Sequence, residues 1–103
     1  MRKIIDRKIY DMKTAISVAT DADHDMNGWR WYEETLYRTN KGAWFLAGEG
    51  GPLSRYAVHF GRGESAAGED IIPLSDEEAF EWLAQIEDFS AIETHFSDYI
   101  DDA

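Results

Sequence analysis

The segment from Trp31 to Glu49 constrains the fold most, because it contains two adjoining stretches that favour β-strands. Trp31 to Thr39 and Ala43 to Glu49 are both rich in aromatic and other β-favouring residues. Asn40-Lys41-Gly42 lies between them and places a glycine where a hairpin turn requires a positive φ. We therefore expect an antiparallel hairpin here.

The pairing of this hairpin determines what must surround it. With a three-residue loop, Tyr37 faces Phe45 and Leu36 faces Leu46. Both faces of the ribbon then carry apolar side chains, and at least one face must be covered by helices. The sequence predicts a single α+β domain over residues 1–103: an antiparallel sheet of three or four strands with two or three helices packed on one face.

The C-terminal part, about residues 75–101, carries the helix signals. Ser75 followed by Glu78 is a capping box, which predicts a helix from Asp76 to about Ile86. Ser90 with Glu93 repeats the signature and predicts a second, shorter helix. The apolar residues that share one face of this second helix are Ile92, Phe96, Tyr99 and Ile100.

The rest of the chain gives weaker local signals. Lys3 to Ile5 and Lys8 to Tyr10 predict a short hairpin around Asp6-Arg7. Asp11 is a possible cap for a helix running to about Thr20, because Ala15, Ile16, Val18 and Ala19 share one side at helical spacing. The other expectations are a polar loop at Asp21 to Gly28, a helical piece at Leu53 to Phe60, a mobile Gly61 to Gly68 segment and a brief strand at Ile71-Ile72.

Charge is distributed very unevenly along the chain. Gly63 to Ala103 contains thirteen Asp and Glu and no Lys or Arg, whereas Met1 to Arg62 contains eight acids and all ten bases. The two parts carry −13 and +2, which give the net −11. Such a field repels nucleic acid and attracts basic protein surfaces. We therefore expect a protein that binds a positively charged partner and does not bind nucleic acid directly.

Composition supports a folded protein over an acidic disordered tail. Hydrophobic residues make up 44% of the chain, which includes four Trp, five Tyr and five Phe. There is no cysteine, so a disulfide framework and a thiolate ligand are excluded. No apolar run approaches the roughly 18 residues needed to span a bilayer. We expect no membrane association, and a location in a bacterial cytoplasm.

The helix after Ser75 is the candidate binding site. At 100° per residue its apolar residues cluster on one side while Glu77, Glu78 and Glu81 lie opposite. Helical rise separates Glu77 from Glu81 by about 6 Å, and one DNA strand carries a phosphate per roughly 3.4 Å of its axis, so an acidic helix face can present a comparable line of charge. The face could mimic phosphates, or it could be an ordinary solvated face. The candidate partner-binding residues are Asp76, Glu77, Glu78 and Glu81, followed by Glu93, Asp98 and Asp101.

Three other patterns in the sequence are typical of binding or catalytic sites. Asp21 to Gly28 resembles the front of a calcium loop, but Met26 stands where glycine is needed and Tyr32 where the closing Glu is needed. Gly48 to Pro52 lacks the Lys-Ser/Thr pair of a phosphate loop. His24, His59 and His95 show no metalloprotease or nucleophile spacing. A small metal-dependent enzyme that uses Asp21, Asp23 and Asp25 with a histidine stays open as an alternative.

Several stretches of the chain carry a family resemblance. They are Lys3 to Asp6, Tyr10-Asp11, Tyr32 to Thr39, Lys41 to Leu46, Gly48 to Ser54, Tyr56-Ala57, Ile72 to Ser75, Glu77 to Ala79 and Trp82-Leu83. Together they resemble a family of small proteins carried on phages and other mobile elements of gut Firmicutes, one branch of which comprises type II-A anti-CRISPR proteins that inhibit Cas9. The likeness extends to about Glu87 and brings no catalytic residues with it.

The resemblance and the charge lead to one expectation. The chain is expected to be an anti-CRISPR protein, not an enzyme, that blocks target DNA by binding a basic surface of Cas9 or its guide complex in the host bacterial cytoplasm. It is expected to act as a monomer without cofactor or metal. Another host DNA-binding protein, such as a restriction enzyme, a repressor or a nucleoid protein, is an alternative partner. A structural role in the phage particle also stays open.

Overall fold

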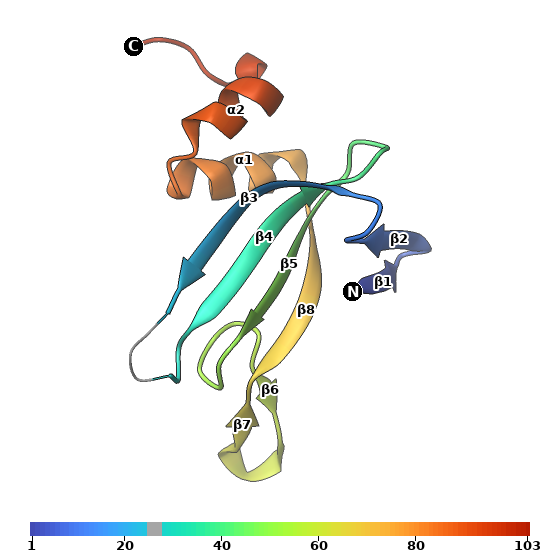
Figure 1. The fold of residues 1–103 in the computed structure, drawn as a ribbon, viewed down its shortest axis with the longest axis vertical. Helices are drawn as coiled ribbons and strands as arrows, with labels where there is room; N and C mark the ends of the chain where they lie inside the picture. Colours follow the sequence, from blue (N-terminus) through green and yellow to red (C-terminus); the bar gives the residue numbers. More distant parts are fainter. Residues whose placement is uncertain (25–27) are drawn as a thin grey trace.

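The hairpin predicted at the centre of the sequence is the middle of the sheet. The computed structural model describes residues 1–24 and 28–103, and its main sheet is antiparallel with four strands in the order β3-β4-β5-β8 (Figure 1). Within the described residues, two small two-stranded sheets, β1-β2 and β6-β7, and two α-helices accompany it, so the fold is α+β as expected.

The element bounds follow the chain order. The strands are β1 Arg2–Ile5, β2 Lys8–Asp11, β3 Ile16–Asp23, β4 Tyr32–Arg38, β5 Trp44–Gly50, β6 Val58–His59, β7 Ser65–Ala66 and β8 Gly68–Leu74. The helices are α1 Asp76–Gln85 and α2 Phe89–His95, and the 3₁₀ turns are η1 Gly61–Gly63 and η2 Ser97–Tyr99.

The register of β4 and β5 agrees with the prediction. Leu36 pairs with Leu46 and Tyr37 with Phe45. Gly42 adopts a φ of 86° in the connecting turn, a conformation that costs glycine little because it has no Cβ. The predicted hairpin is therefore confirmed in both its position and its pairing.

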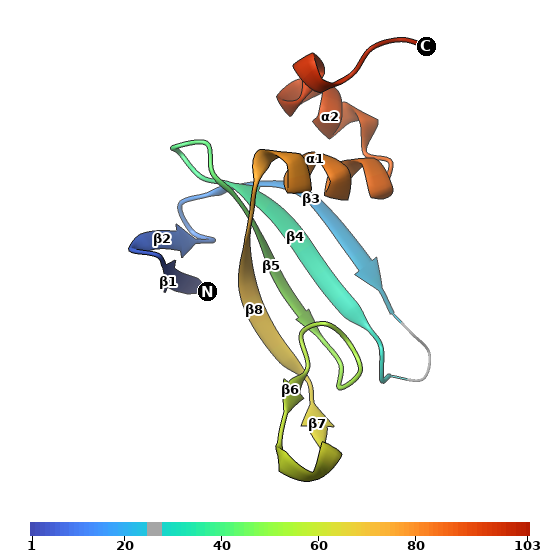
Figure 2. The same cartoon turned by 180° about the vertical axis from the view of Figure 1, so that it is seen from behind.

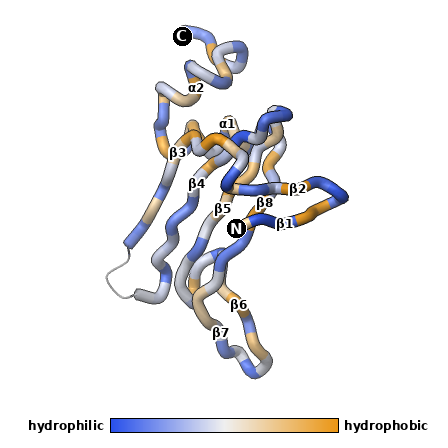
Figure 3. The backbone as a smooth tube through the Cα atoms, turned by 45° about the vertical axis from the view of Figure 1, so that its right-hand side comes forward, coloured by the Kyte–Doolittle hydropathy of each residue, from blue (hydrophilic) through white to orange (hydrophobic). Residues whose placement is uncertain are grey.

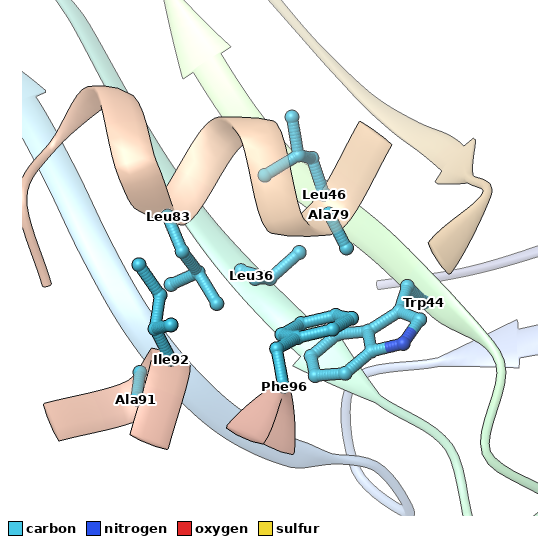
Figure 4. Close-up of a cluster of buried hydrophobic side chains, with 8 residues drawn as sticks. All are labelled: Leu36, Trp44, Leu46, Ala79, Leu83, Ala91, Ile92 and Phe96. Carbon is cyan, nitrogen blue, oxygen red and sulfur yellow. The ribbon is translucent and has the colours of Figure 1, made fainter. Parts of the chain in front are cut away.

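One face of the sheet is covered by the helices. Leu36, Trp44 and Leu46 from the hairpin pack against Ala79 and Leu83 of α1 and against three residues of the α2 region, Ala91, Ile92 and Phe96 (Figure 4). The Trp44 and Phe96 rings are stacked with their centroids 5.1 Å apart. Burying each of the large side chains fully stabilises the folded state by about 1.5–3 kcal/mol relative to leaving it exposed. This packing holds the two helices over one end of the sheet (Figure 2).

The other face is covered in part by the N-terminal hairpin. Tyr10 of β2 packs with Phe45, Ala47 and Ile71 of the sheet, and the Tyr10 and Phe45 rings meet edge to face at 5.7 Å. The β1-β2 hairpin forms where it was predicted, with hydrophobic stretches on both of its strands (Figure 3). Its Asp6-Arg7 turn has two positive φ angles, 51° and 66°, in the region that tight hairpin turns require.

The helix predicted from Asp11 to Thr20 is wrong, because residues 16–23 form β3. Asp11 does begin a helical turn: its carboxylate accepts a hydrogen bond from the Lys13 N–H at 2.9 Å, and its carbonyl accepts one from the Ala15 N–H. The turn stops there, since pairing with β4 gives the next residues a backbone partner. Val18 and Ala19 reach the helix-covered core from a strand with a bulge between Ser17 and Ala19.

Other local predictions need smaller corrections. Asp21 to Asp23 belong to β3 and not to a loop, and the calcium-loop residues Asp25 and Met26 lie outside the described residues. Leu53 to Phe60 is not helical but a series of turns leading into β6. Gly61 to Gly68 contains η1 and β7, and its mobility stays a prediction.

At the C-terminal end, the brief strand predicted at Ile71-Ile72 is the centre of the seven-residue β8, and α1 ends at Gln85, one residue earlier than expected. The cap of α2 is Asp88, whose carboxylate accepts from the Ala91 N–H, and not Ser90. Ile92 and Phe96 are buried as predicted, whereas Tyr99 and Ile100 are exposed beyond the end of α2.

Candidate functional site

The N-terminal end of α1 is built by the capping box that the sequence predicts. The Ser75 hydroxyl accepts a hydrogen bond from the Glu78 N–H at 3.1 Å, and the Glu78 carboxylate accepts one from the Ser75 N–H at 2.9 Å. The hydrogen bond that the Ser75 N–H donates, followed by the Ser75 side chain, holds the pKa of the Glu78 carboxyl below its usual value. Glu78 is therefore ionised and fixed in position at the start of the helix.

All seven predicted partner-binding acids are exposed. The structure brings four of them, Asp76, Glu77, Glu78 and Glu81, together on α1. The other three occupy separate elements, with Glu93 on α2, Asp98 in η2 and Asp101 in the tail. The inward side of α1 carries the buried Ala79 and Leu83, so periodicity predicts the two sides of this helix correctly.

Very little of the negative charge is neutralised within the described part of the chain. Its two ion pairs are Lys3 with Asp70, at 2.6 Å, and Arg55 with Glu34, at 3.7 Å. Of the thirteen acids after Arg62, eleven are exposed, and among the described residues only Asp70 has a basic partner. The acidic end of the chain thus presents its charge to solvent instead of folding against the bases of the front part.

A second acidic feature lies on the opposite side of the sheet. Glu33, Glu49 and Glu69, which we call the glutamate ladder, occupy directly paired positions on β4, β5 and β8. All three are exposed. Each lies three residues from a side chain of its own strand that packs against the helices, so strand alternation places the ladder on the other face. Like charges directly opposite one another destabilise a sheet.

The third feature is a groove that the sequence reasoning missed. It is open, has a volume of about 620 Å³, and is lined from β3, β4, the turns after β5, and α1. At its floor lies Glu34, which is only 6% exposed and is the one buried charged residue among those described. Its lining includes Asp21, Tyr32, Glu34, Arg55, Trp82 and Gln85.

Hydrogen bonds from neutral groups hold Glu34 in place. The Tyr56 hydroxyl donates to Oε2 at 2.5 Å and the Trp82 indole N–H donates to Oε1 at 3.1 Å. Burial, followed by the bond to Glu34, raises the pKa of Tyr56, so this hydroxyl stays a donor. The Tyr56 ring lies so close to Gly48 that a Cβ there would be 2.2 Å from the ring carbon Cζ. Glycine at position 48 therefore allows Tyr56 to reach the carboxylate.

Asp21 and Tyr32 form the outer side of the groove. Asp21 pairs with Glu34 in the β3-β4 register, so two carboxylates lie on neighbouring strands. The Tyr32 hydroxyl donates to Asp21 at 2.9 Å. That hydrogen bond, followed by burial, raises the pKa of Tyr32 to about 12. Asp21 thus has a neutral partner, and its negative charge is not offset within this contact.

A signal for Glu34 was present in the strand pattern. Tyr32, Glu34 and Leu36 are every second residue of β4, so their side chains lie on the same side of the sheet, and Leu36 is fully buried. An acid at an inward position between an aromatic and an apolar residue indicates a carboxylate with dedicated donors. The donors themselves, Tyr56 and Trp82, come from distant parts of the sequence and carry no spacing signal.

The described residues also bear on a metal site. Among the described residues, no three Asp, Glu or His side chains gather closely enough to hold a metal ion. The predicted alternative with Asp21, Asp23 and Asp25 retains two acids on β3, while Asp25 lies outside the described part. Within that part, too, no helix has the length and apolar character needed to cross a bilayer.

Comparisons with protein-family models, with curated proteins and with solved structures find no match for this chain. The family resemblance of the sequence, and the partner that it implies, therefore stay predictions.

Proposed function

We propose that this protein is a binding protein without catalytic activity, and that its acidic C-terminal part occupies a basic, nucleic-acid-binding surface of a partner protein. The observation that carries the proposal is the exposed and unneutralised charge after Arg62. The four acids of α1 are its best-defined portion, because the capping box and the buried side of the helix fix their positions. None of these four acids is buried in the core.

The electrostatics favour a partner that binds nucleic acid. Surfaces that hold DNA or RNA are lined by Lys and Arg, which recognise lines of phosphate charge. One turn of α1 separates Glu77 from Glu81 by about 6 Å, so the helix offers a fixed row of negative charges of comparable density. Because the acids are exposed, this attraction acts mainly on the association rate and weakens with salt.

Cas9 is the first partner to test. It holds its guide–target duplex in a positively charged channel, and it is the partner that the family resemblance implies. An acidic protein bound in or beside that channel would compete with target DNA. A restriction enzyme, a repressor or a nucleoid protein offers the same kind of surface and is the next class of partner to test.

The test is inhibition of target-DNA binding by guide-loaded Cas9, measured with three forms of the protein. The first is unmodified, the second carries Glu77→Gln, Glu78→Gln and Glu81→Gln, and the third carries Gln at the three ladder positions. Both variants change the net charge from −11 to −8, so they differ only in where charge is removed. Glutamine at position 78 can still accept from the Ser75 N–H, which preserves the cap.

We expect the unmodified protein and the ladder variant to inhibit and the α1 variant to lose inhibition. Equal loss in both variants would assign the effect to net charge and not to α1. Absence of inhibition by the unmodified protein would exclude Cas9, and a pull-down from host lysate would then identify which DNA-binding protein is captured. Circular dichroism of both variants checks that they fold.

A further inference from the structure

The groove over Glu34 has unused capacity to accept hydrogen bonds. A carboxylate offers about four acceptor positions, and the Tyr56 hydroxyl and the Trp82 indole N–H use two of those on Glu34. Arg55 lies beside it with 3.7 Å between Nη1 and Oε2, beyond hydrogen-bonding distance, and its side chain is 53% exposed. Acceptor positions on a buried carboxylate therefore remain open toward the groove.

The charges lining the groove do not balance. Asp21 and Glu34 are paired across β3 and β4, and a like-charged cross-strand pair costs about 0.2–1 kcal/mol. Among the described residues that line the groove, Arg55 is the one basic residue, so their formal charges sum to −1. Within the described residues Asp21 has no basic partner, and its hydrogen bond comes from the neutral Tyr32 hydroxyl. A cationic ligand would remove the repulsion between the two carboxylates.

The aromatic walls of the groove favour a guanidinium group over other cations. Trp82 and Tyr32 are half-buried and contribute aromatic rings to the lining. A guanidinium group is planar, can donate two parallel hydrogen bonds to a carboxylate, and stacks on aromatic rings. An anion would meet two carboxylates, and an apolar ligand would cover their remaining acceptor positions without supplying a donor. A metal ion is not favoured either, since no third ligand is close enough among the described residues.

The groove also adjoins the acidic face of α1. Trp82 follows Glu78 by four residues and Gln85 follows Glu81 by four, so each groove residue is the helical neighbour of an exposed acid. A basic surface that docks on α1 would bring its arginines to the rim of the groove.

We infer that this groove is a guanidinium site that accepts one arginine side chain of the basic partner, held between Asp21 and Glu34 with Trp82 beside it. Which protein carries that arginine rests on the proposed function. The site itself does not, because the groove, its two carboxylates and its aromatic wall belong to this chain. The inference assigns the anchoring contact of the interface to residues outside the seven predicted acids.

The test uses the full chain labelled with ¹⁵N and two small probes. N-acetyl-arginine amide carries the guanidinium, and N-acetyl-citrulline amide has nearly the same shape without the charge. The readout is the indole N–H signal of Trp82, assigned by its loss in Trp82→Phe, at matched ionic strength. We expect a saturable shift with the arginine probe and none with the citrulline probe.

Variants locate the site. Asp21→Asn, at a half-buried position, should weaken probe binding about tenfold or more while the dispersed spectrum shows that the fold is intact. Glu34→Gln should do the same, and the ladder variant should bind the probe normally. The inference is overturned if the Trp82 signal does not shift saturably, if citrulline shifts it equally, or if Asp21→Asn binds as well as the unmodified protein. Because no partner is present, failure here leaves the Cas9 experiment unaffected, and failure with Cas9 leaves the probe result unaffected.

Discussion

Removing the Tyr56 hydroxyl tests whether Glu34 depends on its neutral donors. Tyr56 is 4% exposed, and its hydroxyl lies 2.5 Å from Oε2 of a carboxylate that is itself buried, a distance typical of a charge-assisted bond. Tyr56→Phe keeps the ring over Gly48 and deletes only the donor. Hydrogen bonds to charged groups contribute about 1.5–3 kcal/mol, and the Oε2 atom left behind has the Arg55 Nη1 at 3.7 Å, beyond hydrogen-bonding distance.

The expected loss is therefore about 1.5–3 kcal/mol of the free energy of unfolding. For a domain of this size each kcal/mol corresponds to about 4–8 °C in Tm, so Tm should fall by roughly 6–24 °C. Urea unfolding followed by tryptophan fluorescence gives the free energy, and calorimetry gives Tm. A native domain has about 5–15 kcal/mol of stability, so the variant should still fold.

Tyr37→Phe is the matched control. The Tyr37 ring is half-buried and stacked on Phe45 at 5.1 Å, and its hydroxyl takes no part in the hydrogen bonds that hold Glu34. The same chemical change should therefore cost little at this position. If Tyr56→Phe destabilises the protein no more than Tyr37→Phe does, the donors do not stabilise Glu34 and the description of the groove floor is wrong.

Three further changes test other parts of the structure. Gly48→Ala should destabilise the protein by about 1–3 kcal/mol, because its Cβ would meet the Tyr56 ring at 2.2 Å; an unchanged urea midpoint would contradict that close approach. Glu49→Gln should stabilise the sheet by about 0.2–1 kcal/mol, since it removes the central charge of the glutamate ladder; the gain should shrink with added salt, and a loss would refute the repulsion. Burial, followed by the Arg38 guanidinium whose Nη1 lies 3.1 Å from Nδ1, holds the pKa of His95 below its usual 6.5. The contribution of neutral His95 to the free energy of unfolding is therefore full above about pH 6.5 and is lost as pH falls through the folded pKa. The unmodified protein should therefore lose stability relative to His95→Gln between pH 8 and about pH 5. A constant difference between the two proteins would show that His95 does not titrate this way.

The central hairpin and α1 were predictable because several independent signals agree on them. Turn chemistry, strand composition and apolar pairing all place Leu36 opposite Leu46, and the register follows from the loop length. The Ser75 cap, the Glu78 return bond and the helical period likewise agree on where α1 begins and which side is buried. Each of these signals lies within a few residues, so no distant contact is needed to decide them.

The stretch that became β3 was not predictable in this way. Its apolar residues fit a helical spacing, and Asp11 does form a cap. Residues 16–23 form a strand because the edge of β4 offers them backbone hydrogen-bond partners. The local sequence around residues 16–23 does not reveal that pairing. The Glu34 site could not be predicted for the same reason, because its donors Tyr56 and Trp82 are 22 and 48 residues away along the chain.

The central claim is that the exposed acids of α1, and not the net charge, engage a basic surface. It is tested most directly by the dissociation constant of the protein with guide-loaded Cas9 at two salt concentrations, for the unmodified protein, the α1 variant and the ladder variant. Three exposed charge contacts, each changing the affinity by a factor of about 1.4 to 5, predict binding roughly 3- to 150-fold weaker for the α1 variant, with a smaller salt dependence. The ladder variant should bind like the unmodified protein. If the two variants instead show the same affinity and the same salt dependence, α1 is not the binding surface.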